Sequence, residues 1–311
     1  MLRVFKRFGV LLSLILLSAC TSVPIKVKDI PLPEALPIVA ATSNRPLVAL
    51  VLGSGGNRGF AHVGVIKVLE ENNIPVDIVV GTSVGSMVGA LYAGGFHAAE
   101  LEKLALNLEQ GQLNDYELSF EGYIRGELLQ DFINHELHDR TIEQLGKPFA
   151  AIATELSSGK AAAFNHGNTG MAVRASSSIP GVFLPILING SEYVDGGLKD
   201  PVPVKIAQQM GADVVIAVDV SRLPLNNQRA SNVLQIWIQS ARIMQQTIAE
   251  NEIKSAQIVI RPQIGATPKI NLVSKHSLVK AGEDAANAAI PAIRYWLKKI
   301  ADEKLQEHPV K

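Results

Sequence analysis

The chain has one cysteine, few aromatic side chains and no net charge. These features argue against disulfide bonds, cysteine-based metal sites and nucleic-acid binding. Because Cys20 is the only cysteine among 311 residues, neither an intrachain disulfide nor a cysteine-based metal site can form. Aromatic residues make up 5% of the chain, which is poor for base stacking, and 29 basic side chains balance 29 acidic ones. With no basic run either, the sequence argues against nucleic acid as the main partner.

Hydrophobic residues make up 47% of the chain, and Ala, Val, Ile and Leu dominate them. Strand-like apolar runs alternate with helical patterns almost throughout, without internal repeats. This alternation predicts an α/β fold with a mostly parallel central sheet and helices on both faces. The expected strands cover 47–52, 76–80, 149–156, 160–164, 192–194, 213–220 and 257–260, with 160–164 pairing to 149–156. The expected helices cover 59–71, 84–93, 97–109, 126–138, 169–177, 202–210, 232–251 and 276–300.

The first nineteen residues are typical of a secretory signal, with a basic start and an apolar run from Phe8 to Leu17. The segment Leu17-Ser18-Ala19-Cys20 then resembles the lipobox of bacterial lipoproteins. An uncleaved membrane anchor with an incidental cysteine is the alternative, but the apolar run is shorter than the ~20 residues of a spanning helix. We therefore predict a lipoprotein signal peptide over 1–19.

Acyl chains on Cys20 would tether the protein to a bilayer. By the sorting rule of that lipoprotein class, Thr21 after the cysteine implies the outer membrane, with the folded domain in the periplasm. Residues 20–46 contain five prolines and little periodicity, which predicts an extended linker between the lipid and the domain.

The segment Ile78–Ser86 has the form of a nucleophile elbow, a sharp turn from strand to helix that exposes one serine. In Gly81-Thr82-Ser83-Val84-Gly85, a side chain at 81 or 85 would collide with the neighbouring strand or helix. Ser83 would stand at a helix N-terminus, where the dipole favours developing negative charge. An ordinary Gly/Ser-rich turn is the alternative.

The turn Gly53–Gly59 offers several backbone N–H groups at a helix start, which makes it an anion-binding nest. It lacks the Gly-Lys-Ser/Thr of a phosphate-binding P-loop, and Arg58 stands where a dinucleotide fingerprint needs its third glycine. An oxyanion hole for Ser83 is the remaining interpretation, since such donors often come from an earlier strand-to-helix loop.

A serine nucleophile needs a base, and none of the seven histidines lies in a motif typical of a catalytic loop. His276 would complete a Ser–Asp–His order, but its polar surroundings are typical of a helix start at the surface. Asp195 ends an apolar strand before two glycines, and a buried carboxylate acts as a base when its pKa rises. A solvated Asp-Gly turn is the alternative for Asp195.

Three motifs in a fixed order together resemble those of the patatin-like phospholipases. They are Gly55-Gly56-Asn57-Arg58-Gly59, Gly81-Thr82-Ser83-Val84-Gly85 and Asp195-Gly196-Gly197. The bacterial branch of that family is matched further at 59–65, 175–183 and 195–220. The resemblance covers about residues 47–220 well and the rest weakly.

The resemblance implies a three-layer α/β/α fold and a Ser–Asp dyad that uses no histidine, metal or cofactor. Ser83 would be the nucleophile, Asp195 the proton acceptor, and the N–H groups of Gly55, Gly56 and Asn57 the oxyanion hole. Ser54 stands where many members have another glycine. The motif positions that would support the site are Gly53, Arg58, Gly59, Gly81, Gly85, Gly196 and Gly197.

We therefore expect a catalytic domain over 47–220 and a C-terminal portion, 221–311, that completes its sheet rather than covers the site. The expected function is that of a serine hydrolase of lipid acyl esters, acting on membrane lipids. A low-turnover lipid-binding envelope protein and an acyltransferase remain alternatives. Residues 110–125 form either a lid or an ordinary surface loop, and the sequence sets no oligomeric state.

Overall fold

The computed structural model describes residues 30–109, 111–117, 119, 122–221, 232–265 and 271–307. The chain divides into two compact units, Met1–Ile30 and Pro31–Lys311. All the helices and strands described here belong to the second unit. The predicted signal peptide over 1–19 and Cys20 lie outside the described residues, so the lipoprotein assignment stays a prediction.

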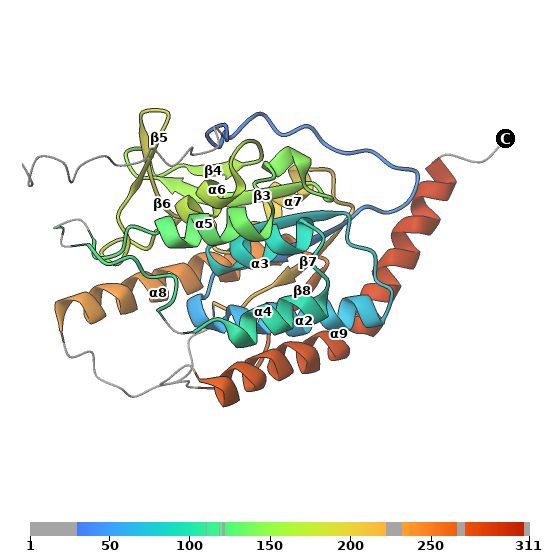
Figure 1. Ribbon diagram of the computed structural model, residues 1–311. Helices are drawn as coiled ribbons and strands as arrows, with labels where there is room; N and C mark the ends of the chain where they lie inside the picture. Colours follow the sequence, from blue (N-terminus) through green and yellow to red (C-terminus); the bar gives the residue numbers. More distant parts are fainter. Residues whose placement is uncertain are drawn as a thin grey trace, which may run out of the picture. The chain divides into compact units, whose positions relative to one another are not determined.

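Within the described residues, eight strands form one sheet in the order β5-β6-β3-β2-β1-β7-β8, and β4 pairs with β3 off this path (Figure 1). The pairs among β3, β2, β1, β7 and β8 are parallel, whereas β4, β5 and β6 join by antiparallel pairs. The strands are β1 (Val48–Leu52), β2 (Ile78–Thr82), β3 (Phe149–Glu155), β4 (Ala161–Phe164), β5 (Ile186–Ile188), β6 (Ser191–Asp195), β7 (Val214–Val218) and β8 (Ile258–Ile260).

Helices cover both faces of the sheet. Successive side chains of a strand point to opposite sides, so each buried strand supplies apolar side chains to both helical layers. Along β1, Leu50 packs into a core with α2, α3, α4 and α9, and Val51 into a second core with α7 and the end of α8. This three-layer arrangement confirms the predicted fold class. The helices are α2 (Phe60–Glu71), α3 (Val84–Ala93), α4 (Ala98–Asn107), α5 (Glu127–Glu136), α6 (Thr169–Ser176), α7 (Val204–Gln209), α8 (Val233–Glu252) and α9 (Leu272–Glu307).

The strand β5 was not expected from the sequence. It forms a hairpin with β6 across Asn189-Gly190, and both turn residues have positive φ, 50° and 84°. Asn-Gly between short strands is the strongest local signal of such a turn, so the hairpin could have been predicted from Asn189-Gly190. The hairpin matters because it carries Asp195 at the end of β6.

The C-terminal portion, residues 221–311, both extends the sheet and lines the cavity, whereas only the first role was expected. Strand β8 extends the sheet beside β7, as predicted. Helix α8, however, also lines the cavity at the candidate site through Trp237, Ile238 and other side chains. The expectation that this portion would not cover the site is therefore corrected.

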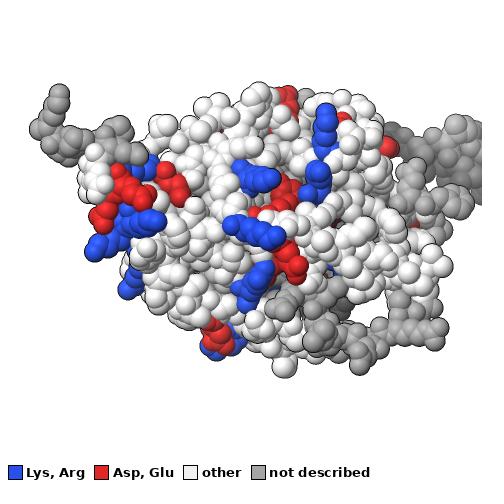
Figure 2. Space-filling model, turned by 180° about the vertical axis from the view of Figure 1, so that it is seen from behind, with Lys and Arg blue, Asp and Glu red and all other residues white. Residues whose placement is uncertain are grey.

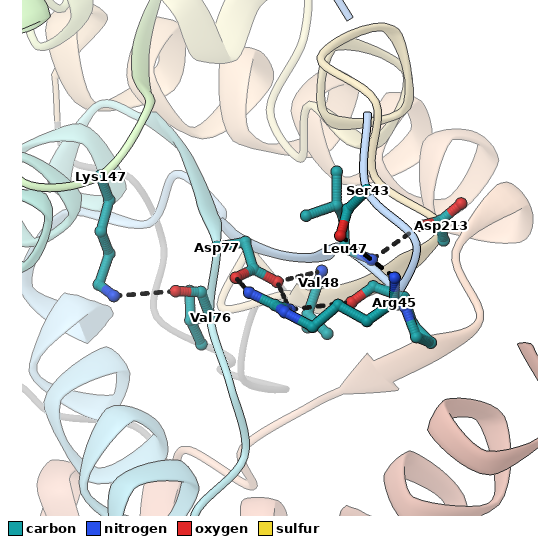
Figure 3. A network of polar contacts seen from close by, with 9 residues as sticks. Ser43, Arg45, Leu47, Val48, Val76, Asp77, Lys147 and Asp213 are labelled. Atoms are coloured by element: carbon teal, nitrogen blue, oxygen red, sulfur yellow. Dashed lines mark hydrogen bonds and ion pairs between the residues drawn. The ribbon is translucent and has the colours of Figure 1, made fainter. Parts of the chain in front are cut away.

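Hydrogen bonds and an ion pair hold residues 31–46 against the domain, whereas the sequence predicted an extended linker over 20–46. The Glu34 N–H donates to the His166 carbonyl at 3.0 Å, and the Ala41 N–H donates to the Met210 carbonyl at 3.0 Å. The Arg45 guanidinium then binds both carboxylate oxygens of Asp77, at 2.5 and 2.8 Å (Figure 3). These contacts lie ahead of β1 and β2, at the amino ends of the strands.

Charged side chains mix on the face shown in Figure 2, where Lys and Arg lie next to Asp and Glu among many uncharged residues. Ion pairs such as Lys304–Asp213, at 2.7 Å, and Lys67–Glu283, at 2.7 Å, follow the same pattern. No helix in the described part of the chain is both long and apolar enough to cross a membrane.

Candidate active site

Ser83 lies between the end of β2 and the start of α3, with φ 55° and ψ −125°. A residue other than glycine seldom adopts a positive φ, and such strain is found mainly at functional sites. The two glycines beside it allow the turn. A Cβ on Gly81 would stand 2.4 Å from the Gly85 carbonyl oxygen, and a Cβ on Gly85 only 2.0 Å from that of Leu52. The steric reason given for both glycines is confirmed.

The register of β3 brings Asp195 to Ser83. On β3, Ile152 pairs with Thr82 of β2, and the next residue, Ala153, pairs with Asp195 of β6. The ends of β2 and β6 therefore meet at neighbouring positions of one strand. Gly196 permits this approach, because a Cβ there would stand 2.1 Å from the Ile152 carbonyl oxygen.

The Ser83 hydroxyl donates a hydrogen bond to Oδ2 of Asp195 at 2.6 Å. The other carboxylate oxygen, Oδ1, accepts the Gly197 N–H at 2.7 Å, which fixes the plane of the carboxylate. The Ser83 N–H donates to the Ser176 hydroxyl at 2.8 Å. Ser83 and Asp195 are 5% and 6% exposed, so their contact is shielded from bulk water.

Burial raises the pKa of Asp195 to about 6, although the hydrogen bonds from Ser83 and Gly197 act in the opposite direction. Burial has this effect because it penalises the charged form of a carboxyl group. Asp195 is consequently ionised at neutral pH but more basic than an ordinary aspartate. A carboxylate of this basicity in contact with a hydroxyl can accept its proton.

The glycine-rich loop follows β1 and faces the same cavity as Ser83. Its start is anchored, since the N–H groups of Gly53 and Ser54 donate to the carbonyls of Val218 and Pro201. Among the described residues, none accepts a hydrogen bond from the N–H groups of Gly55, Gly56 and Asn57. Gly59 fits against α3, because a Cβ there would stand 2.2 Å from a methyl group of Val84.

His62, on α2, braces this loop rather than the serine. Its Nε2 lies 2.8 Å from the Gly53 carbonyl oxygen. Burial lowers the pKa of His62 to about 4, so the ring is neutral. His276 is exposed on α9, and the described contacts of Ser83 include no histidine.

A cavity of about 310 Å³ opens beside the two side chains. The loop 54–58, Ser83, Asp195 and Gly197 form one side of it, and Ile179, Pro180, Val182 and Leu198 add apolar surface. Helix α8 contributes a further wall through Trp237, Ile238, Ala241, Arg242 and Gln245. The Gln245 amide also donates to the Ser54 hydroxyl at 2.6 Å, which joins α8 to the loop.

The sequence did not predict that these α8 residues line the cavity. It also did not predict that the Ser176 hydroxyl accepts the Ser83 N–H. The signal for the wall is weak, because α8 is distant in sequence from every motif and its pattern is that of an ordinary amphipathic helix. Of the predicted loop 110–125, the structure describes 111–117, 119 and 122–125, and none of these residues lines the cavity.

Within the described residues, no cluster of His, Cys, Asp and Glu side chains is arranged to hold a metal ion. The arrangement instead provides a strained serine, a buried carboxylate, free backbone N–H groups and a largely apolar cavity. Together these can carry out nucleophilic acyl transfer on an apolar substrate.

The sequence is similar to a family profile and to several known proteins. A family profile described as patatin-like phospholipase matches residues 50–207. An uncharacterized NTE family protein of Mycobacterium tuberculosis is 35% identical over 235 residues, which are 74% of this chain and 64% of that protein. Lysophospholipase nte1 of Aspergillus fumigatus is 38% identical over 185 residues, 58% of this chain and 12% of the fungal protein. The matches thus span less than two thirds of these relatives.

Among solved structures, VipD from Legionella pneumophila is similar, with a TM-score of 0.56 and 13% sequence identity. The match covers 85% of this chain and 71% of that one. At such low identity the likeness shows a shared fold and nothing further.

Proposed function

The chain belongs to the patatin-like phospholipase family, and from that membership we propose that it is a serine hydrolase of lipid acyl esters. In this proposal Ser83 is the nucleophile and Asp195 the general base. The observation that carries it is the 2.6 Å hydrogen bond from the Ser83 hydroxyl to the buried carboxylate of Asp195, beside a cavity with free N–H donors.

The reaction begins when Asp195 accepts the Ser83 hydroxyl proton and the serine oxygen attacks the ester carbonyl carbon. The carbonyl oxygen becomes an oxyanion, which the N–H groups of Gly55, Gly56 and Asn57 stabilise by about 3 kcal/mol for each donor. The intermediate then expels the alcohol, which takes the proton from Asp195. A water molecule, deprotonated by Asp195, then attacks the acyl-enzyme carbonyl, and the fatty acid leaves as Asp195 returns the proton to the Ser83 oxygen.

The cavity and the fungal relative, whose name describes a lysophospholipase, support a proposal for the substrate class. The apolar walls formed by Ile179, Val182, Leu198 and Trp237 suit an acyl chain. We propose acyl esters of phospholipids and lysophospholipids as substrates. The predicted lipid on Cys20, with an outer-membrane location, would hold the enzyme beside them.

The first test compares Ser83→Ala and Asp195→Ala with the unaltered protein on a panel of esters, from short p-nitrophenyl esters to phospholipids. Each change should lower kcat/KM by at least about a thousandfold, because the two groups act as a unit. A fluorophosphonate probe should label the wild type and leave the Ser83→Ala protein unlabelled. Circular dichroism should show that both variants are folded.

The matched control is Ser158→Ala, which removes an exposed serine hydroxyl bonded only to local groups. It should retain full turnover and labelling. If the folded wild type neither labels nor hydrolyses any ester, the protein is a lipid-binding member of the family instead. Activity retained in Asp195→Ala but lost in His276→Ala would replace the dyad with a triad.

A further inference from the structure

The cavity carries more positive charge than the proposed chemistry uses. Three ionisable side chains line it: Arg58 from the glycine-rich loop, Arg242 from α8, and Asp195. The Asp195 carboxylate is already engaged by Ser83 and Gly197. Two guanidinium groups therefore line one cavity, of which Arg58 has contacts of its own.

Of these three side chains, Arg242 is the one for which neither the proposed reaction nor the packing of the fold gives a role. Among the described residues it has no hydrogen-bonding or ion-pair partner, although it reaches the cavity wall. It is also the only charged residue of α8 between Val233 and Ala249. Without an opposite charge three or four residues away, this arginine gains no ion pair along the helix.

Arg58 and Arg242 are close enough to oppose each other electrostatically. Burial lowers the pKa of Arg58 to about 10, and the charge of Arg242 acts in the same direction. Asp219 opposes this only in part. Its carboxylate is bound by Ser221 at 2.6 Å and by Arg261 at 3.2 Å. Like charges held together in a partly buried site are stabilised when an anion binds between them.

We propose that Arg242, together with Arg58, forms a phosphate-binding subsite beside Ser83 that favours acyl esters carrying a phosphate group. A guanidinium pairs with phosphate through two parallel N–H bonds, so arginine suits this ligand better than lysine. In a lysophospholipid the phosphate lies only a few bonds from the ester. A cavity of about 310 Å³ can hold both groups at once.

This inference rests on the proposed hydrolase activity and adds a specificity determinant to it. Arg58 lies within residues 50–207, which match the family profile, whereas Arg242 lies outside them. The preference for phosphate would thus depend on a helix that the family match does not include. The adjacent Trp237 and Ile238 leave an apolar surface for the acyl chain next to the charged one.

The kinetic test uses two soluble esters with the same acyl chain, a 1-acylglycerol 3-phosphate and the corresponding 1-acylglycerol, both below micelle-forming concentrations. In Arg242→Gln, the ratio of kcat/KM for the phosphate ester to that for the neutral ester should fall roughly tenfold or more. Arg242→Lys should recover part of the ratio. Arg294→Gln is the matched control, because Arg294 bonds Asn72 away from the cavity, and its ratio should stay that of the wild type.

An equal loss on both esters in Arg242→Gln would overturn the proposal, since the residue would then support the site in general. A binding test separates this inference from the hydrolase function. Ser83→Ala protein should bind glycerol 3-phosphate and inorganic phosphate in a calorimeter, but not glycerol, and Arg242→Gln should abolish that binding.

The two tests fail in distinguishable ways. If no ester is hydrolysed by the wild type, the proposed function fails while phosphate binding remains measurable. If both esters are hydrolysed at the same ratio by wild type and Arg242→Gln, the subsite is wrong and the hydrolase stands. Binding of inorganic phosphate with no preference for the phosphate-bearing ester would also overturn the specificity role.

Discussion

The two regions that meet at the cavity are held in different ways. Within residues 50–207, the groups proposed to react are buried and fixed by backbone packing, with Ser83 and Asp195 almost inaccessible. On α8, Trp237 is 49% exposed, and Ile243 and Met244 are exposed beside it. The difference indicates that the geometry at the serine is set by the sheet, whereas α8 adds exposed side chains to the lining of the cavity.

Within the described residues, helix α8 packs into the core near its C-terminus. Near its C-terminus, Ala249 packs into the core and the Glu252 carboxyl accepts the Val202 N–H at 2.8 Å. Burial raises the pKa of Glu252, and the neighbouring Asp200 acts in the same direction. The rest of α8, toward Val233, is largely exposed. Substitutions at the packed glycines of the first region should therefore affect stability, and substitutions on the exposed part of α8 should affect substrate affinity.

The largest expected effect is that of Gly85→Ala. The new Cβ would stand 2.0 Å from the Leu52 carbonyl oxygen, and neither backbone segment can move without disturbing the sheet. We expect the free energy of unfolding, measured by urea denaturation, to fall by roughly 3 kcal/mol or more. Gly146→Ala is the control, since its nearest contact would be 3.4 Å away, and it should change stability by no more than about 0.5 kcal/mol. Equal stabilities would contradict rigid packing at the elbow.

The next effect is on the pH dependence of activity. Because the carboxylate form of Asp195 is the reacting form and burial raises its pKa, kcat/KM should be constant well above about pH 6. Below that value it should fall tenfold for each pH unit, as Asp195 becomes protonated. The measurement is kcat/KM against pH on a short, non-ionisable ester.

The control for the pH profile is Glu252→Gln, which replaces a carboxyl group of raised pKa, outside the cavity lining, by an amide of the same shape. It should leave the midpoint unchanged. A midpoint near the ordinary aspartate pKa of about 4 would contradict the effect of burial. A midpoint that moves in His276→Ala would assign the proton transfer to histidine.

The smallest expected effect is that of Trp237→Ala. Removing this indole takes apolar surface from the cavity wall without altering the contact between Ser83 and Asp195. KM for a long-chain ester should rise by about three- to tenfold, with little change in kcat. Tyr295→Ala, which removes an exposed aromatic ring on α9, should leave KM unchanged. A large loss of kcat in Trp237→Ala would mean that α8 also positions the reacting groups.

The features that the sequence predicts here have local physical causes. The strand β1 follows from an apolar run, and the elbow follows from Gly81 and Gly85, whose packing needs are met within a few residues. For the same reason Ser83 could be assigned to a strand end. The order of alternating strands and helices was enough to predict a mostly parallel sheet.

Features that depend on contacts between distant residues could not be derived in this way. The approach of Asp195 to Ser83 requires β3 to pair with both β2 and β6 in one register, and only the family resemblance implied it. The wall formed by α8 requires a helix about 150 residues after Ser83 to fold back over the cavity. No sequence motif around Trp237 or Gln245 indicates that these side chains line the cavity.

The attachment of residues 31–46 determines where the autonomous folding unit begins. A fragment cut at 47, just ahead of β1, would keep every residue of the cavity. It would nevertheless remove Arg45 from the Asp77 carboxylate and take the Ser43 carbonyl from Lys304. It would also leave the backbone of Met210 and Asn168 without partners at 41 and 31. The second compact unit thus begins at Pro31, seventeen residues before the first strand of the sheet at Val48.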